Sequence, residues 1–147
     1  MNRKIVEVKM LMLADAAHQM IYLMEFVDQF RRSADAAVIE RPLNYFSGKT
    51  VAVQIAESSM AGNGTTASDV AVRVEEEAID ALLAATVESL CLEVNLAVPV
   101  WVKAVPPCRY PYFVSGVESI KAITLVESPV SFRRRNVFVL KNFLSRA

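Results

Sequence analysis

The N-terminal segment carries the strongest hydrophobic pattern of the chain. Between Ala14 and Ser33, polar side chains recur every three or four positions and leave a broad apolar face that includes Leu23, Val27 and Phe30. This period is typical of an amphipathic helix. Upstream, residues 4–13 alternate with period two, which is typical of a strand. Because Met and Leu are good helix formers, we expect one long helix over this segment, with a strand over 4–13 as the alternative.

Two short segments in the middle of the chain share a strand-like alternation. Residues 51–55 (VAVQI) and 70–74 (VAVRV) place branched apolar side chains at every second position. Between them lies a loop over residues 61–66 with an Asn63-Gly64 pair, which readily adopts the positive φ angles of a tight turn. The pattern predicts an antiparallel pair of strands joined by a long loop.

A second helix is predicted to open at Glu75-Glu76-Glu77, because acidic residues in a first turn favour the positive end of the helix dipole. Its apolar stripe runs to Val94, and Pro99 ends it. Further apolar segments at 98–105, 120–126 and 137–140 are interpreted as strands. Together these elements predict an α+β fold, a mainly antiparallel sheet of about five strands with two or three helices on one face. The alternative is a mostly β fold with one helix, in which residues 4–30 form two strands.

Length and composition fit a single globular domain over residues 1–147. Hydrophobic residues make up 54% of the chain, which is more than one small core requires. The predicted N-terminal helix also concentrates flexible thioether side chains that suit an irregular partner surface, at Met10, Met12, Met20 and Met24. We therefore expect a homo-oligomer, most simply a dimer, formed through this face.

The apolar segments do not indicate a membrane protein. The best candidate span, residues 10–30, is interrupted by charged and polar residues, and the basic start lacks the features of a secretory signal. Cys91 and Cys108 are the only cysteines and are expected to be free thiols. These observations predict a cytoplasmic protein without a membrane contact.

Charge is balanced overall but unevenly distributed. Sixteen basic residues match sixteen acidic ones, so no whole-molecule field would attract nucleic acid. Residues 57–93 contain many acidic residues and almost no basic ones, whereas all charged residues in 133–147 are basic. Arg133, Arg134 and Arg135 are a candidate phosphate-binding cluster flanked by aromatic residues. Pairing with the acidic middle segment is the simpler interpretation, and any nucleic-acid contact would be weak.

A proline-stiffened loop gathers aromatic and cationic side chains. Residues 101–113 contain one tryptophan, two tyrosines, one phenylalanine and one arginine, which together suit the wall of a ligand pocket. The candidate ligand-binding residues are Trp101, Arg109, Tyr110, Tyr112 and Phe113. With Arg109 as the only charged contact, the pocket would favour a small, partly aromatic and anionic ligand.

The candidates for catalysis are few. His18 follows Asp15 by three residues, which lets the pair form an oriented base on a helix. Cys108 beside Arg109 is a candidate nucleophile. One histidine and two separated cysteines match no metal-ligand spacing, and the Gly62–Thr66 loop lacks the lysine of a phosphate-binding loop. The sequence thus predicts no cofactor and no metal.

Three function classes follow from these residues. The first is a non-catalytic binding or interaction module that self-associates and has an aromatic-lined pocket. The second is a small enzyme that uses His18 with Asp15, or Cys108. The third is a weakly nucleic-acid-associated regulator acting through Arg133 to Arg135.

Overall fold

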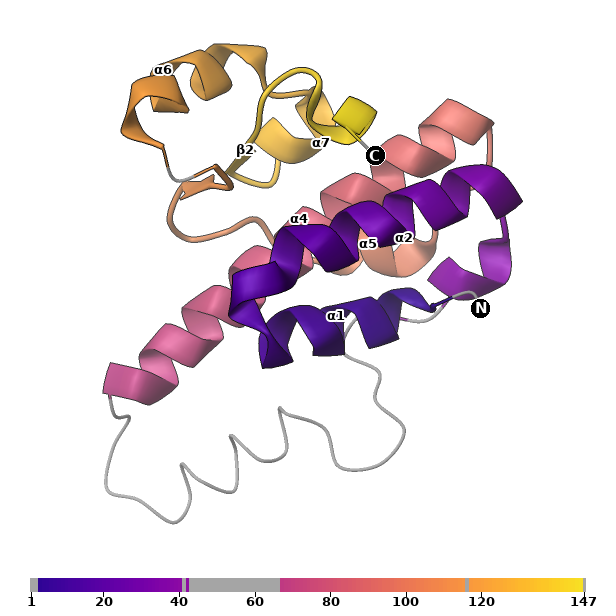
Figure 1. The fold of residues 1–147 in the computed structure, drawn as a ribbon, viewed down its shortest axis with the longest axis horizontal. Helices are drawn as coiled ribbons and strands as arrows, with labels where there is room; N and C mark the ends of the chain where they lie inside the picture. The colour runs from indigo at the N-terminus through magenta and orange to yellow at the C-terminus, as the bar shows by residue number, and fades with distance from the viewer. Residues whose placement is uncertain (1–2, 41, 43–66, 116, 147) are drawn as a thin grey trace.

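The computed structural model describes residues 3–40, 42, 67–115 and 117–146 (Figure 1). The α-helices are α1 Ile5–Ala14, α2 Gln19–Ser33, α4 Ala67–Val94, α5 Val100–Ala104, α6 Glu118–Glu127 and α7 Val130–Arg133. Short 3-10 helices are η1 Ala16–His18, η2 Ala36–Ile39 and η3 Phe143–Arg146. Strands β1 Tyr112–Phe113 and β2 Val137–Phe138 pair in parallel, and no other strand occurs in these ranges. The expected α+β fold with a five-stranded antiparallel sheet is therefore wrong, and the chain is mainly helical.

The helices α1 and α2 pack against each other, and α2 buries part of the apolar face that the pattern over residues 14–33 predicts. Their core residues recur at helical spacing: Ile5, Val8 and Met12 from α1, and Leu23, Phe26, Val27 and Phe30 from α2. The helical prediction for both segments is confirmed, but the single continuous helix is wrong. Asp15 has φ −134° and ψ 80°, so the chain leaves the helical conformation there and turns through η1.

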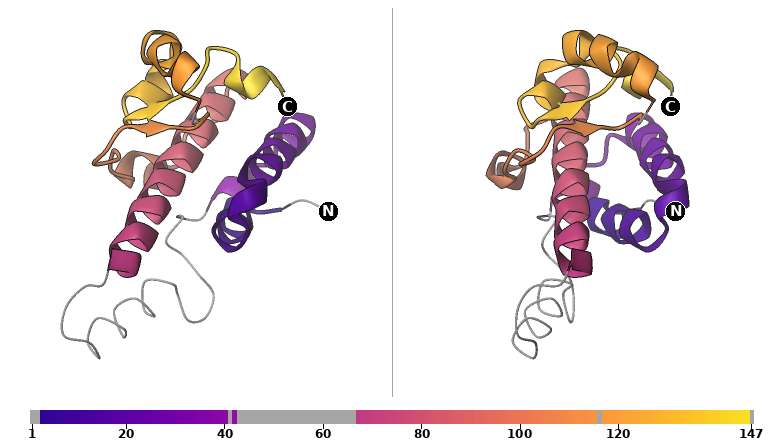
Figure 2. Two further views of the ribbon diagram at one scale, coloured as in Figure 1. Left: turned by 60° about the vertical axis from the view of Figure 1, so that its left-hand side comes forward. Right: turned by 90° about the vertical axis from the view of Figure 1, so that its left-hand side faces the viewer.

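The long helix α4 lies at the centre of the molecule (Figures 1 and 2). Its 28 residues extend over about 42 Å at the usual helical rise. It contacts α1 and α2 on one side and α5, α7 and β2 on others. Residues 81–88 are consecutively buried, because neighbouring elements cover every face of this part of the helix. Most of the hydrophobic core of the described residues is built around it.

Part of α4 occupies a segment that was expected to be a strand. Residues 70–74 are helical, so the strand prediction there is wrong. A period-two pattern over five residues contains too few positions to exclude a helix, and Ala and Arg favour one. The predicted strand over 51–55 and the loop over 61–66 lie outside the described residues.

The end of α4 is formed by a left-handed residue. Asn95 has φ 60°, and the Leu96 N–H donates to the Cys91 carbonyl at 2.8 Å, which satisfies one of the last carbonyls of the helix. Pro99 then precedes α5, and the Val102 N–H donates to the Pro99 carbonyl at 3.1 Å. The strand expected over 98–105 is thus wrong, because Pro99 is the N-cap of a helical turn and its carbonyl accepts the first hydrogen bond of that turn.

The C-terminal part combines α6, α7 and the short sheet. Residues 120–126 lie in α6, so the expected strand there is also wrong, whereas β2 forms within the predicted segment 137–140. The sheet register pairs Tyr112 with Val137 and Phe113 with Phe138, whose rings stack 5.3 Å apart. In the part of the chain that the structure describes, no helix combines the length and apolarity that crossing a membrane requires.

Candidate functional site: a pocket around Trp101

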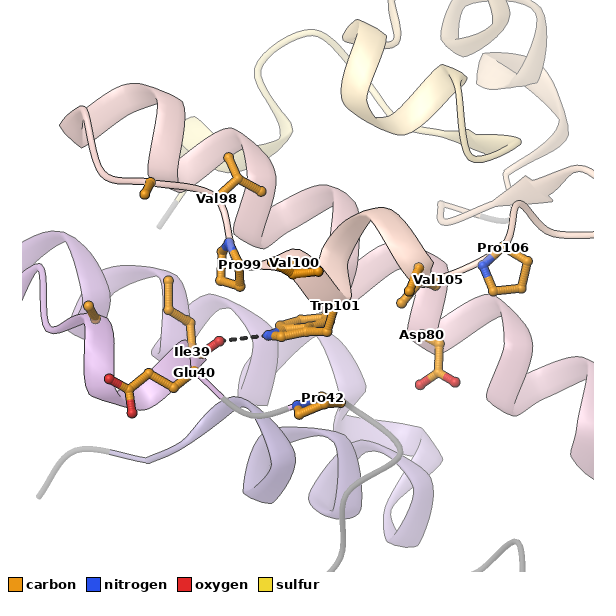
Figure 3. A pocket seen from close by; sticks show the side chains of 13 residues that line it. Ile39, Glu40, Pro42, Asp80, Val98, Pro99, Val100, Trp101, Val105 and Pro106 are labelled. Atoms are coloured by element: carbon orange, nitrogen blue, oxygen red, sulfur yellow. Dashed lines mark hydrogen bonds between the residues drawn. The ribbon is translucent and has the colours of Figure 1, made fainter.

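A pocket of about 810 Å³ opens between η2, the middle of α4 at Asp80 and the segment that carries α5 (Figure 3). Most of its lining is apolar, and its volume lies within the range of small-molecule sites. The residues that line it are Ala36, Ile39, Glu40, Pro42, Asp80, Ala97, Val98, Pro99, Val100, Trp101, Ala104, Val105 and Pro106.

Trp101 is the aromatic wall of this pocket, and its ring is held in place. The side chain is buried, and its Nε1–H donates to the Ile39 carbonyl at 2.8 Å. That bond joins α5 to η2 and satisfies the polar end of the indole. This bond fixes the orientation of the ring, which lies beside Pro42 and Pro99 (Figure 3).

Asp80 supplies a negative charge at one end of the pocket (Figure 3). Its Oδ1 lies 2.8 Å from the Lys9 Nζ, and the Glu76 Oε1 lies at the same distance from that ammonium. Lys9 itself is fully buried. Burial raises the pKa of Asp80; Lys9 opposes this effect, and the charges of Glu76 and Glu77 add to it. The carboxylates of Glu76 and Asp80, both on α4, thus share the ammonium of Lys9.

A second hollow of about 240 Å³ adjoins the first around Asp80, Val105 and Pro106. It is lined in addition by Glu76, Glu77 and Arg109. The Arg109 Nε lies 3.2 Å from the Glu77 Oε2, and the Arg109 backbone N–H donates to the Glu77 Oε1 at 3.1 Å. The only charged residue of the predicted aromatic pocket is therefore engaged by a glutamate.

The structure does not bring the five predicted ligand-binding residues into one site. Trp101 lines the large pocket and Arg109 the adjoining hollow, whereas Tyr110 is exposed. Tyr112 is half-buried in β1, and Phe113 stacks on Phe138 with the Lys121 Nζ 5.3 Å from its centroid. Burial raises the pKa of Tyr112, so its phenol stays protonated.

Cys108 lies at the edge of the core beside α4. Its Sγ is 3.9 Å from the Glu77 carbonyl, and burial together with the charge of Glu77 raises its pKa to about 11. A thiol is nucleophilic as the thiolate, which is scarce at neutral pH at such a site. The geometry is that of a structural thiol.

His18 and Asp15 form a hydrogen-bonded pair on the surface. The His18 Nδ1 lies 2.9 Å from the Asp15 Oδ2, and the Tyr22 hydroxyl donates to the same oxygen at 2.8 Å. The hydrogen bond from Tyr22, followed by that from His18, lowers the pKa of Asp15. This carboxylate therefore orients both neighbouring rings, at a position that does not line the Trp101 pocket.

The three consecutive arginines all make contacts within the chain, although only Arg135 is buried. Arg133 donates to the carbonyls of Val126 and Ser128, at 2.8 and 3.0 Å. Arg134 pairs with Glu88, and the Arg135 Nη2 lies 2.6 Å from the other oxygen of the same carboxylate. Arg135 is also buried and donates to the Ser131 carbonyl at 2.8 Å. Pairing with the acidic middle segment is confirmed for Arg134 and Arg135.

Sequence reasoning missed most of the pocket wall. Four lining residues come from segments that are distant in the sequence or that were predicted to form other elements, and none of the four belongs to a recognisable motif. They are Ile39, Asp80, Val98 and Pro99. The prolines that bracket 99–106 are the one signal that marks this turn-rich segment. Among residues 3–40, 42, 67–115 and 117–146, no group of three or more His, Cys, Asp or Glu is arranged to hold a metal ion.

The candidate site is therefore a pocket that has the Trp101 indole in one wall and the Asp80 carboxylate in another, which we call the acidic wall. Comparison of the chain with protein-family models, curated proteins and solved structures finds no match.

Proposed function

We propose that this protein is a binding module that takes a small apolar ligand into the Trp101 pocket. The observation that carries the proposal is the fixed indole at the wall of an apolar pocket of about 810 Å³. Sites of this kind combine apolar lining with a few polar groups that set orientation. We further propose that the protein resides in the cytoplasm, where its two free thiols stay reduced.

An enzymatic function is less well supported. The pKa of Cys108 is raised to about 11, and the hydrogen-bonded His18 and Asp15 do not line this pocket. A role in nucleic-acid binding is likewise disfavoured, because Arg133 to Arg135 donate to carbonyls and to Glu88. Binding without chemistry is the simplest activity that the described side chains support.

Tryptophan fluorescence tests the proposal directly, since Trp101 is the only tryptophan of the chain. A neutral apolar probe, phenylpropanol, is titrated while the emission and the melting temperature are recorded. We expect a saturable change in emission and a rise in melting temperature, because a ligand that binds only the folded state stabilises it. An emission that stays constant up to the solubility limit of the probe would contradict the proposal.

A matched pair of variants locates the binding. Ala104 is exposed and lines the pocket, so Ala104→Phe should fill it and abolish the response. Ala122 is an exposed alanine of α6 that does not line the pocket, and Ala122→Phe should leave the response unchanged. Equal effects of the two substitutions would place the binding elsewhere.

We also propose that the chain self-associates. The observation in favour is the outer face of α6, where Ile123, Leu125 and Val126 are exposed, and Val130 beside it is exposed as well. An apolar surface of this kind is typical of an interface. The Met-rich segment contributes less exposed apolar surface than the sequence suggests, because Met12 lies in the core.

A further inference from the structure

We infer that the Trp101 pocket selects ligands that carry an ammonium group on an apolar body, with Asp80 as the group that binds the ammonium. This inference rests on the proposed function and adds the charge of the ligand to it. The inferred ligand charge is opposite to the negative charge that Arg109 suggests from the sequence.

The acidic wall carries more negative than positive charge. Among the described residues around Asp80, the carboxylates of Glu76, Glu77 and Asp80 face the cations of Lys9 and Arg109. Glu77 pairs with Arg109. The two remaining carboxylates, Glu76 and Asp80, therefore have one cation between them, Lys9. A ligand ammonium near Asp80 would balance the remaining charge, whereas a ligand carboxylate would add to it.

Asp80 can be reached from the pocket while it keeps its lysine. Its side chain retains 24% exposure and lines both hollows, whereas Lys9 is fully buried and belongs to α1. The ammonium of a ligand and that of Lys9 would therefore approach the carboxylate from different sides. A carboxylate accepts several charge-assisted hydrogen bonds, so the two cations do not compete for a single lone pair.

The rest of the pocket suits the body of such a ligand. Trp101 lies between Asp80 and the segment of Ile39 and Pro42, and Val105 lies beside Asp80 (Figure 3). An ammonium bound at Asp80 would place an attached aromatic or alkyl group against the indole. Burial of that group supplies affinity, and the charge supplies discrimination between ligands of the same shape.

The test compares three probes with one apolar body: phenylpropylamine, phenylpropanol and phenylpropanoate, each followed by Trp101 fluorescence. We expect the amine to bind about tenfold more tightly than the alcohol and the carboxylate to bind least. If the alcohol binds and the amine binds no better, the charge inference fails and the binding proposal stands. If none of the three binds, both fail.

Two variants with opposite expected effects identify the charges involved. Asp80→Asn should remove the preference for the amine over the alcohol. Arg109→Ala should increase it by about threefold, a modest change because the side chain is 72% exposed and screened by solvent. Since Arg109 lies on the surface, this variant carries the test if Asp80→Asn does not fold. An unchanged or reduced preference for the amine in Arg109→Ala would overturn the inference.

Discussion

Lys9 is the least expected residue of the core. Its side chain is fully buried, although it lies in α1 among apolar residues, and it reaches the carboxylates of Glu76 and Asp80 across the interface with α4. A charged group at such a position is tolerated because its partners offset the loss of hydration. Nothing in the spacing of α1 marks this lysine, since its neighbours in sequence alternate like a strand.

The substitution Lys9→Met should destabilise the protein by about 3 kcal/mol, because it leaves two partly buried carboxylates without their cation. Urea denaturation followed by circular dichroism measures the loss. Adding Glu76→Gln and Asp80→Asn to the same chain should recover most of it, because the uncompensated charges are then gone. A triple variant as unstable as the single one would show that packing, and not charge, dominates at this position.

The Cys108 thiol should make the free energy of unfolding decrease at alkaline pH. The pKa of its thiol is raised from 9.0 to about 11, mainly by burial, so the folded state keeps the proton in a range where the unfolded state has lost it. The contribution is complete below pH 9 and is lost as the pH rises towards 11. We expect Cys108→Ser to flatten the decline of the unfolding free energy over this range, as measured by urea denaturation at several pH values. A decline as steep as that of the parent protein would assign the pH dependence to other groups.

At the scale of elements, α4 explains both the success and the failure of the sequence reasoning. Its apolar stripe from Ile79 to Val94 is long enough to identify a helix, whereas the five-residue alternation at 70–74 is not. The shorter helices α5 and α6 contain branched residues that favour strands. Pro99 precedes the helical turn of α5, whereas α6 begins after Val117 without a proline. Short runs of branched apolar residues were therefore the least reliable guide to the fold.

The pocket was less accessible to prediction than the elements around it. The sequence makes Trp101 a candidate ligand-binding residue, and in the structure it lines the pocket. Asp80 was not identified, because its role depends on the rotation of α4 and on the packing of α5 beside it. The pairing of Arg109 with Glu77 joins residues 32 positions apart, which a local motif does not reveal.

Glu88 joins α4 to the residues that follow α7 through its pairs with Arg134 and Arg135. Because Arg135 is buried, Glu88→Ala leaves a cation without its carboxylate and should cost about 3 kcal/mol of unfolding free energy. Glu93 in the same helix provides the matched control. Its pair with Arg31 is more exposed, so Glu93→Ala should cost less than about 1 kcal/mol. Thermal denaturation of both variants checks the difference, and similar losses would contradict the assigned role of Glu88.

At the scale of the whole molecule, the balanced charge of the chain opposes neither a monomer nor a symmetric dimer. The exposed apolar residues are then the candidates for a surface of self-association. Those of α6 lie on its outer face, whereas Ile21 and Met10 are exposed on the N-terminal helices. Two candidate surfaces for self-association therefore belong to separate parts of the fold.

Sedimentation velocity at micromolar concentration should reveal a dimer that Val126→Glu converts to a monomer. The introduced charge would otherwise be buried at the interface without a partner. Ile21→Glu, on the surface expected from the sequence, should leave the dimer intact. If Ile21→Glu alone dissociates the dimer, the interface is the Met-rich face, and a parent protein that sediments as a monomer would contradict self-association through either surface.

The alanines of α4 set a limit on how this sequence can diverge. Ala81, Ala84 and Ala85 are fully inaccessible where the N-terminal helices and the C-terminal elements meet the same stretch of helix. A larger side chain there would have to displace neighbours that are themselves packed, at a cost typical of overfilled cores. Distant relatives would therefore be expected to keep small residues at these positions, with an acid at Glu88 and an arginine pair beyond it. A search for distant relatives of this chain could therefore use that combination in place of overall similarity.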